Sequence, residues 1–362
     1  MVLGLRGIPD VQGGVETHAQ HLYPRLARLG CDVEVLVRTQ YVSPGQSHFG
    51  AVRLRRVWCP RSARLEALIH SVIGVAVAGL LRPDILHIHA VGPAIVTPIA
   101  RLMGLRVVVT HHGPDYDRDK WGPFARWVLR TGERFGMRYS NARIAISKVI
   151  ADLIMRKYDR DAALIPNGVL PVVATGDHEY VDRFGLEPGK YFLNVGRLVP
   201  EKRQLDLIKA YQIVPATSWK LALVGGLSSD AYSSEVRAVA NVPGVVLTGF
   251  LSGTALRQIY ANAGAFVLPS SHEGLPIAML EALSYGLPVL ASDIPPNLEV
   301  GLNSECYFPL GNLAALANGL SRLSHEERND RARVDLRDWV ARRYNWDEIA
   351  DGTLRVYEYV CQ

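Results

Sequence analysis

Residues 263–292, AGAFVLPSSHEGLPIAMLEALSYGLPVLAS, contain two short apolar stretches on either side of a helical pattern. The first stretch, 263–270, and the second, 286–292, are typical of buried strands. Between them, Pro276 is well placed as the first helical residue and Gly286 as the residue that stops the helix. A strand, a helix and a strand in this order predict a parallel βαβ unit, because parallel strands need a crossover connection.

The same alternation of apolar strands and amphipathic helices runs through the whole chain, which we assign to the α/β class. Two sets of strands, divided near residues 166–189, imply two doubly wound domains that face a cleft. Ligands of such sheets bind beyond the carboxyl ends of the strands. The expected strands are 2–5, 32–38, 51–58, 84–90, 106–112 and 143–147 in the first half, and 190–198, 219–226, 244–250, 263–270 and 286–292 in the second.

The composition fits a globular protein with two domains. The chain has 362 residues, of which 48% are hydrophobic and 21% are charged. Its longest apolar run, 67–81, is short for a membrane span and contains His70, so we expect a buried helix there. The net charge of +5 could favour an acidic partner, but it is too small to identify one.

The cysteines and the start of the chain favour a cytoplasmic protein. The chain begins MVLGLRGIPD, without the basic start or the cleavage-like site of a signal peptide. The cysteines are scattered and form no CxxC or Cys/His cluster, so we expect neither a disulfide framework nor a zinc site. They are Cys31, Cys59, Cys306 and Cys361.

Two glutamates stand out in the apolar stretch quoted first. Glu273 precedes the expected helix, 276–285, and Glu281 lies one to two turns inside it. Backbone amides and the positive end of the helix dipole at this loop suit a phosphate or a sugar hydroxyl, and carboxylates accept hydrogen bonds from the hydroxyls of polyols. The alternative is a capping role for Glu273 and a solvated face for Glu281. Apolar neighbours of Glu281 disfavour that alternative: Ile277, Leu280 and Leu283.

Two cations follow another expected strand, in the segment NVGRLVPEKRQ at 194–204. Arg197 and Lys202 flank the start of a helix, where together they could clamp an anion such as a diphosphate. The alternative is ordinary surface charge, with Lys202 paired to Glu201 or Asp206. The presence of the two glutamates in the same domain favours the clamp.

Paired glycines open the first helix of the chain. Gly13 and Gly14 follow the first strand, and glycines at such a position let the backbone approach a ligand closely. A simple tight turn explains them equally well. Neither a GxGxxG fingerprint nor a P-loop occurs in the sequence.

Histidines cluster at the ends of two expected strands. The strand at 106–110 delivers His111 and His112 to the cleft, but neighbouring residues of an extended chain point to opposite sides, which disfavours metal binding by this pair. His112 could contact a sugar. In ILHIHA, His87 is expected to be a satisfied core residue, whereas His89 lies nearer the strand end and could equally serve an acceptor site.

These motifs together resemble the family 4 retaining glycosyltransferases, whose GT-B fold consists of two Rossmann-like domains. The family's E-x7-E motif is matched by Glu273 and Glu281, and its G-R-L-x(n)-K clamp by Gly196, Arg197, Leu198 and Lys202. The segments RGIP…GGVET and HHGPDYDRDKWGPFARWVL are similar to a bacterial, rhamnosyltransferase-like subgroup of surface polysaccharide synthesis. YNWDEIADGTLRVYEYV resembles the family's final helix, which crosses back onto the first domain.

The resemblance implies an acceptor-binding domain at 1–168, completed by the helix 346–362, and a nucleotide-sugar-binding domain at 169–345. It implies a retaining, metal-independent hexosyltransferase without a cofactor. The donor would be a UDP-, GDP- or dTDP-linked sugar, and the acceptor a glycan or lipid-linked molecule of cell-surface polysaccharide synthesis.

Site residues follow from the same resemblance. Arg197 and Lys202 would neutralise the diphosphate, and two cations at this position would do the electrostatic work of a metal. Glu281 would bind the ribose. Catalytic roles would fall to His112, Glu273, Arg197 and Lys202. Donor binding would involve Gly13, Gly14, Gly196, Arg197, Lys202, Glu273, Gly274, Leu275 and Glu281, and acceptor binding His89 and Asp115.

Other functions remain open at this point. A nucleotide-sugar epimerase or hydrolase on the same fold, or a non-catalytic sugar-nucleotide-binding module, would use a similar site. A nucleic-acid binder is disfavoured, because the basic residues are dispersed. The sequence departs from the family at DIPPNLEV, where Pro295 and Pro296 replace a frequent Gly-Gly turn and predict a stiffer loop.

Two basic segments predict peripheral contact with an anionic membrane at the inner face of the cell membrane. Solvated helix faces are an equally good explanation. The first segment, 53–66, contains Arg53, Arg55, Arg56, Arg61 and Arg64 beside Val57 and Trp58. The second, 126–138, contains Arg126, Arg130, Arg134 and Arg138 beside Trp127 and Phe135.

Overall fold

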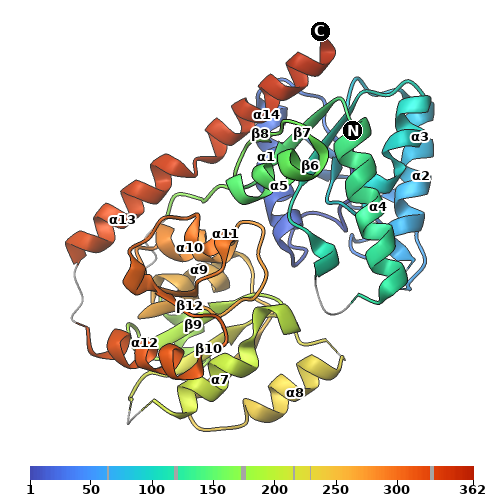
Figure 1. Cartoon of the computed structure of the whole chain (residues 1–362). Coiled ribbons are helices and arrows are strands. Elements are labelled where there is room, and N and C mark those ends of the chain that lie inside the picture. Colours follow the sequence, from blue (N-terminus) through green and yellow to red (C-terminus); the bar gives the residue numbers. More distant parts are fainter. Residues whose placement is uncertain (63–64, 118–120, 173–176, 215–216, 229, 327–329) are drawn as a thin grey trace. The chain divides into compact units, whose positions relative to one another are not determined.

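The computed structural model describes the chain except residues 63–64, 118–120, 173–176, 215–216, 229 and 327–329. The chain divides into two compact units (Figure 1). Unit 1 consists of Met1–Gly168 and Asn345–Gln362, and unit 2 of Val169–Tyr344. Each unit is a largely parallel sheet flanked by helices, which confirms two doubly wound α/β domains.

The sheet of unit 1 has, within the described residues, the strand order β3-β4-β2-β1-β5-β6-β7-β8. Its edge strand β3 pairs with β4 in the antiparallel direction, and the strands from β4 onward run parallel. All residues of β5 and β6 are buried, as expected for central strands that are covered on both faces. The strands are β1 Val2–Leu3, β2 Glu34–Arg38, β3 His48–Phe49, β4 Val52–Val57, β5 Leu86–His89, β6 Val107–His111, β7 Ala142–Ala145 and β8 Ala163–Leu164.

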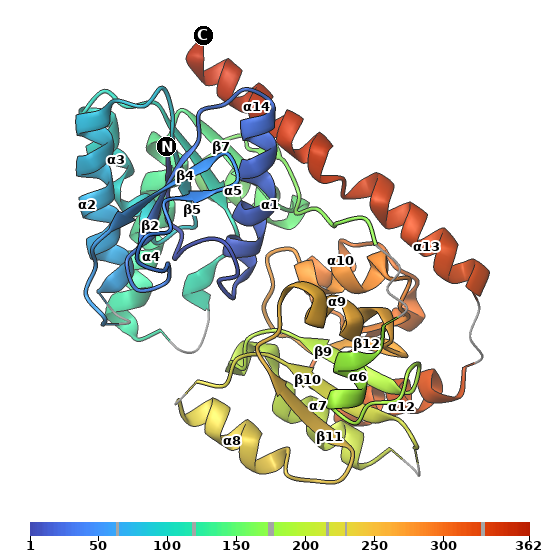
Figure 2. The same cartoon turned by 180° about the vertical axis from the view of Figure 1, so that it is seen from behind.

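The last helix of the chain belongs to unit 1, as the family resemblance implied. It packs against α1, and Arg25 Nε donates a 2.8 Å hydrogen bond to Asp347 Oδ1 between the two helices (Figure 2). The helices of unit 1 are α1 Gly14–Arg28, α2 Glu66–Leu81, α3 Thr97–Leu102, α4 Pro123–Tyr139, α5 Lys148–Tyr158 and α14 Trp346–Cys361, with the short 3-10 helices η1 Pro93–Val96 and η2 Asp115–Asp117.

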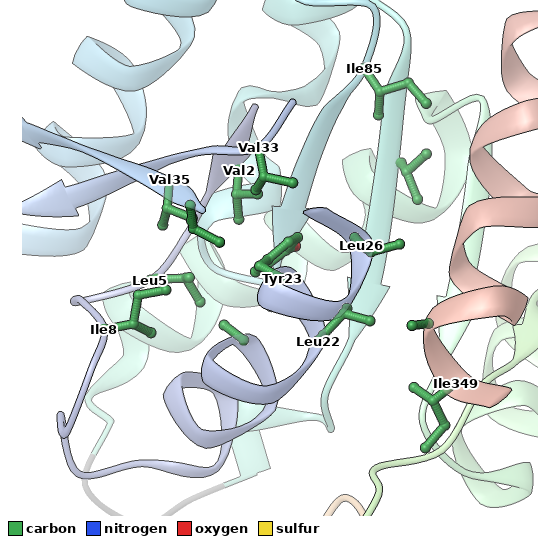
Figure 3. Packing of buried hydrophobic residues seen from close by; sticks show 14 of the residues in the cluster. Val2, Leu5, Ile8, Leu22, Tyr23, Leu26, Val33, Val35, Ile85 and Ile349 are labelled. Atoms are coloured by element: carbon green, nitrogen blue, oxygen red, sulfur yellow. The ribbon is translucent and has the colours of Figure 1, made fainter. Parts of the chain in front are cut away.

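The core of unit 1 lies between α1, the sheet and α14 (Figure 3). Leu22, Tyr23 and Leu26 of α1 are buried at helical spacing, so one stripe of this helix faces the strands. Ile349 of α14 joins the same cluster. The first helix of the chain therefore depends on the last one for part of its packing.

The apolar run at 67–81 forms the helix α2, but it is buried on one face only. Gly74, Val75 and Ala78 pack inward, whereas Leu80 is 83% exposed. The expectation of a buried helix was therefore right for the inner face and wrong for the outer one, which none of the described residues of unit 1 covers. Among the described residues, no helix combines the length and the apolar character that a membrane crossing requires.

The described part of unit 2 forms a parallel sheet in the order β11-β10-β9-β12-β13-β14. Its strands are β9 Tyr191–Val195, β10 Lys220–Val224, β11 Val245–Gly249, β12 Ala265–Leu268, β13 Val289–Ser292 and β14 Tyr307–Phe308. Its helices are α6 Glu179–Arg183, α7 Gln204–Gln212, α8 Ala231–Val239, α9 Gly253–Ala261, α10 Ile277–Ser284, α11 Pro295–Leu298, α12 Leu313–His325 and α13 Asp330–Arg343, with η3 Pro200–Lys202 and η4 Ser304–Cys306.

Replacing Trp346 tests the contribution of α14 to unit 1. The Trp346 side chain is 2% exposed, and its ring lies 5.5 Å from the ring of His18. We expect Trp346→Ala to lower the free energy of unfolding by about 3–5 kcal/mol, because it leaves a cavity. Urea unfolding followed by hydrogen exchange of unit 1 peptides measures the effect. Tyr359→Ala in the same helix, where Tyr359 is 72% exposed, is the control and should change the stability little. Equal stabilities of the two variants would contradict this account of the core.

Candidate active site

The carboxyl ends of β9 and β12 bring the predicted cations and acids of unit 2 to one edge of the sheet. The two strands are parallel neighbours, so the loops that follow them start side by side. Gly196 follows β9, and Lys202 ends the 3-10 helix η3 in the same loop. Glu273 lies in the loop after β12. We call this part of unit 2 the carboxyl edge.

Lys202 and Glu273 form an ion pair across the carboxyl edge. Lys202 Nζ lies 2.5 Å from Glu273 Oε1, and the two side chains are only 20% and 10% exposed. Each charge offsets the loss of water around the other. Asp206, one of the alternative partners expected for Lys202, binds Arg203 instead. Sequence spacing could not reveal the true partner, because it comes from another βα loop.

Hydrogen bonds of the backbone fix both loops of this ion pair. The Ser271 amide donates a 2.9 Å hydrogen bond to the Glu201 carbonyl, which joins the loop of Glu273 to that of Lys202. The Arg197 carbonyl accepts a 2.9 Å hydrogen bond from Gln204 Nε2, so the start of α7 is tied back to the end of β9. Arg197 is partly exposed at this edge.

Gly225 is a residue of the carboxyl edge that the sequence analysis missed. It follows β10, and a Cβ atom at this position would lie 2.0 Å from the carbonyl oxygen of Gly196. Only glycine therefore allows the ends of β9 and β10 to approach this closely. The GG dipeptide at 225–226 was the available signal in the sequence.

Glu281 is half-buried and makes a polar contact inside unit 2. The Tyr260 hydroxyl donates a 3.0 Å hydrogen bond to Glu281 Oε2, and Tyr285 stacks on Tyr260 with ring centroids 5.4 Å apart. Burial raises the pKa of Glu281 from 4.5 to about 7, and the hydrogen bond from Tyr260 only partly opposes this shift. Glu281 therefore changes its charge near neutral pH.

Residues Gly274 and Leu275 follow Glu273 at the carboxyl edge. Gly274 is partly exposed, whereas the Leu275 side chain is buried. In the loop after β13, Pro295 begins the single helical turn α11, and the greater stiffness expected of this loop stays a prediction. Proline suits the first position of a helix, where its missing N–H costs no hydrogen bond.

In unit 1, Gly13 has a structural reason to be glycine. Its φ is 156°, and a Cβ atom there would lie 2.1 Å from Glu16 Oε2. Arg6 Nε binds Glu16 Oε1 at 3.0 Å. Burial raises the pKa of the Glu16 carboxyl, but the hydrogen bond and charge of Arg6 outweigh it, so the net pKa is lowered. Close approach of a ligand to Gly13 and to Gly14, the first residue of α1, stays a prediction.

The neighbouring histidines His111 and His112 point to different partners, as expected for an extended strand. His111 is fully buried, and its Nε2 atom lies 2.9 Å from Glu133 Oε1. Burial raises the pKa of Glu133, but hydrogen bonds from His111 and Tyr158 and the charge of Lys157 lower it to about 2. His111 is therefore part of an interior network, whereas His112 is partly exposed.

His112 stands at the outer end of a chain of buried polar side chains. Its Nε2 atom lies 2.8 Å from His89 Nδ1, and the Tyr23 hydroxyl contacts the other ring nitrogen of His89. His89 is 0% exposed, which places it behind His112 and corrects the expectation of a direct acceptor contact. His87 is confirmed as a satisfied core residue, with Thr110 Oγ1 2.7 Å from its Nε2 atom.

Two further features complete this end of unit 1. Asp115 begins η2, directly after His112, Gly113 and Pro114, and is partly exposed. His18 of α1 lies 5.1 Å from the His112 ring and binds Asn167 Oδ1 through Nδ1 at 2.9 Å. Sequence analysis did not single out His18, although it directly follows the segment GGVET, because it is 94 positions from His112.

Comparisons with known families identify the chain. The model described as "Glycosyl transferase 4-like domain" matches residues 13–168, and the model described as "Glycosyl transferases group 1" matches residues 179–337. The chain is a glycosyltransferase of the GT-B fold.

Relatives and solved structures agree with this assignment. The chain is 26% identical to a 2-deoxystreptamine N-acetyl-D-glucosaminyltransferase of Streptomyces fradiae, over 85% of this chain and 81% of the relative. It is also 26% identical to a GDP-mannose:cellobiosyl-diphosphopolyprenol alpha-mannosyltransferase of Komagataeibacter xylinus, over 96% and 90%. Sucrose-phosphate synthase of Thermosynechococcus elongatus has the same fold, with a TM-score of 0.82, 20% identity and coverage of 99% and 98%.

A further structural neighbour was solved with a nucleotide sugar. HepE of Anabaena in complex with UDP-glucose matches this glycosyltransferase with a TM-score of 0.79 and 17% identity, over 99% of this chain and 98% of HepE. At such identity the match establishes the fold.

The raised pKa of Glu281 predicts a pH-dependent stability. Between pH 4.5 and about 7 the unfolded chain has released the proton that folded Glu281 keeps, so the stability falls as the pH rises through this window. Glu281→Gln should remove that loss. We compare the difference between the melting temperatures of the variant and of the wild type. This difference should be larger at about pH 8 than at about pH 5. Glu235→Gln, which changes an exposed residue of α8, is the matched control. A difference that does not depend on pH would contradict the shifted pKa.

Proposed function

We propose that this glycosyltransferase moves a hexosyl group from a nucleotide-diphosphate sugar to a glycan or lipid-linked acceptor of cell-surface polysaccharide synthesis. The transfer retains the anomeric configuration and needs no metal in the donor site. The main support is the Lys202–Glu273 ion pair at the carboxyl edge, beside Arg197. The names of two neighbours, one bound to UDP-glucose and one using a diphosphopolyprenol acceptor, support both substrate classes.

The cations at the carboxyl edge suit a diphosphate. The Lys202 ammonium has three N–H donors, and the one that binds Glu273 leaves others for phosphate oxygens. Arg197 adds a planar guanidinium that can bind two oxygens of a phosphate at once. As the bond between the sugar and the phosphate breaks, both cations stabilise the growing negative charge of the leaving diphosphate.

The carboxylates suit the hydroxyl groups of the donor. Glu281 accepts hydrogen bonds from the ribose, and Tyr260 orients its carboxyl group. Glu273 holds hydroxyls of the transferred sugar together with the amides of Gly274 and Leu275.

The acceptor hydroxyl attacks the anomeric carbon on the face that the diphosphate leaves, and a phosphate oxygen takes the acceptor proton. His112 contacts the reacting sugar, Gly13 and Gly14 approach the diphosphate, and Asp115 binds the acceptor.

Replacing Lys202 tests the donor site. A panel of UDP-, GDP- and dTDP-sugars is first ranked by the rise in melting temperature of the wild-type protein. With the best donor, we expect Lys202→Ala to weaken binding by about 10- to 100-fold in calorimetry, because a hydrogen bond to a charged group is lost. Lys209→Ala, which changes an exposed lysine of α7, should bind like wild type. Unchanged donor binding in Lys202→Ala would refute the proposed clamp.

A second experiment separates transfer from the alternative activities, none of which the comparisons support. The protein is incubated with its donor in the absence and presence of an acceptor extract. Transfer predicts a glycosylated product that depends on the acceptor, and its loss in Glu273→Ala. Epimerised donor without acceptor would favour an epimerase, and free sugar would favour a hydrolase.

We also propose that α4 contacts an anionic membrane that carries the acceptor. Phe124 and Trp127 stack with ring centroids 6.0 Å apart and are 71% and 61% exposed. Exposed Arg130, Arg134 and Arg138 follow at intervals of one helical turn, so aromatic and basic side chains share the helix surface. This combination suits the boundary between lipid headgroups and acyl chains.

The other basic segment, 53–66, is a weaker candidate for membrane contact. Arg53 binds Asp32 at 2.8 Å and Arg55 binds Glu34 at 2.9 Å, so acids of β2 and its preceding loop neutralise both arginines. Arg64 lies outside the described residues. For this segment the explanation by ordinary solvated charge is the better one.

Co-sedimentation with vesicles tests the proposal for α4. We expect wild-type protein to bind phosphatidylglycerol vesicles and not phosphatidylcholine vesicles. Trp127→Ser should reduce the bound fraction, because it removes an exposed apolar ring. Tyr359→Ser, a change on the exposed side of α14, serves as the control and should bind normally. Equal binding of both variants would refute a role for α4.

A further inference from the structure

Three histidines of unit 1 bring one ring nitrogen each into a common space. His18 comes from α1, His89 ends β5 and His112 follows β6. These three nitrogen atoms lie within 4.8 Å of one another. His18 and His89 are buried, whereas His112 is partly exposed. Histidines from three parts of the chain that are distant in sequence thus come together only in the folded unit.

We propose that His18, His89 and His112 bind a single transition-metal ion of the Zn²⁺ type. A set of three imidazoles suits Zn²⁺, Co²⁺, Ni²⁺ or Cu²⁺, whereas Mg²⁺ and Ca²⁺ prefer oxygen ligands. Three protein ligands leave the fourth tetrahedral position for water. The partly exposed side of His112 gives the ion access from solvent.

The outer nitrogens of the two buried rings already have partners. His18 Nδ1 lies 2.9 Å from Asn167 Oδ1, an acceptor that requires a proton on this nitrogen and leaves Nε2 with its lone pair. The Tyr23 hydroxyl lies beside His89 Nε2, so Nδ1 is the nitrogen that faces the cluster. Hydrogen bonds of this kind orient histidine ligands in metal sites.

His89 Nδ1 and His112 Nε2 lie 2.8 Å apart. Ligands of tetrahedral zinc are about 3.4 Å apart, so binding requires these two nitrogens to separate slightly and the His18 nitrogen, within 4.8 Å of both, to take up the same spacing.

This site shares His112 with the proposed sugar transfer, whereas Arg197, Lys202, Glu273 and Glu281 of the proposed donor site belong to unit 2. Metal binding to these histidines does not contradict the prediction that sugar transfer itself needs no metal. A metal held by His112 would take this side chain away from the sugar, so Zn²⁺ should inhibit transfer. That consequence rests on the proposed function, whereas metal binding itself does not.

Metal titration of the full chain tests the site, with the purification tag removed and bound metal stripped by a chelator. We expect one Zn²⁺ per chain in calorimetry, no binding of Mg²⁺, and visible absorption bands of tetrahedral cobalt when Co²⁺ replaces Zn²⁺. His112→Ala and His18→Ala should abolish the cobalt bands. Asn167→Ala should keep the ligands but weaken Zn²⁺ binding by about 10- to 100-fold.

His21→Ala is the matched control, because His21 lies one turn from His18 on α1 outside the cluster. It should bind Zn²⁺ like wild type. Melting temperatures establish that each variant is folded, and His112→Ala, at the partly exposed position, disturbs packing least. Absence of stoichiometric Zn²⁺ binding to wild type, or unchanged binding in folded His112→Ala, would overturn the proposal. Inhibition of transfer by Zn²⁺ without stoichiometric binding would overturn it too.

Discussion

The ion pair between Lys202 and Glu273 is the interaction on which the carboxyl edge of unit 2 depends. It joins the loops after β9 and β12, which lie 71 residues apart in sequence, and both side chains are largely buried. A charge in such a place is stable only with a partner, and removal of either one leaves the other uncompensated. The pair therefore fixes the two loops before any ligand arrives. A site built in this way would lose little conformational entropy on binding the proposed diphosphate.

In unit 1, buried polar side chains also need partners, but at His18, His89 and His112 these partners carry no charge. Burial keeps His18, His89 and His112 neutral, and each finds a hydrogen-bond partner or a neighbouring ring. The buried acids Glu16 and Glu133 differ from these histidines, because each contacts a cation or several hydrogen-bond donors and stays charged. Neutral imidazoles suit sugars or metal ions of the Zn²⁺ type, whereas the charged networks hold the scaffold.

The sequence predicted what depends on local pattern. Alternating apolar strands and helices are visible within short windows, and they were enough for the two α/β domains and for Glu273, Lys202 and their loops. The partners of these residues were not predictable. Tyr260 reaches Glu281 from another helix, and Asn167 reaches His18 across 149 positions. Two-residue strands such as β3, β8 and β14 carry too little periodicity to be recognised.

The C-terminal helix α14 shows why the histidines belong to the architecture of the whole unit. Its Tyr357 hydroxyl lies 2.6 Å from His87 Nδ1, and its Trp346 ring packs 5.5 Å from His18. Through Tyr23, which contacts both His87 and His89, the same helix is connected to His112 by contacts between side chains. The helix α14 thus helps to determine the surroundings of His112, which follows β6. Unit 1 is complete only when both ends of the chain have folded into it.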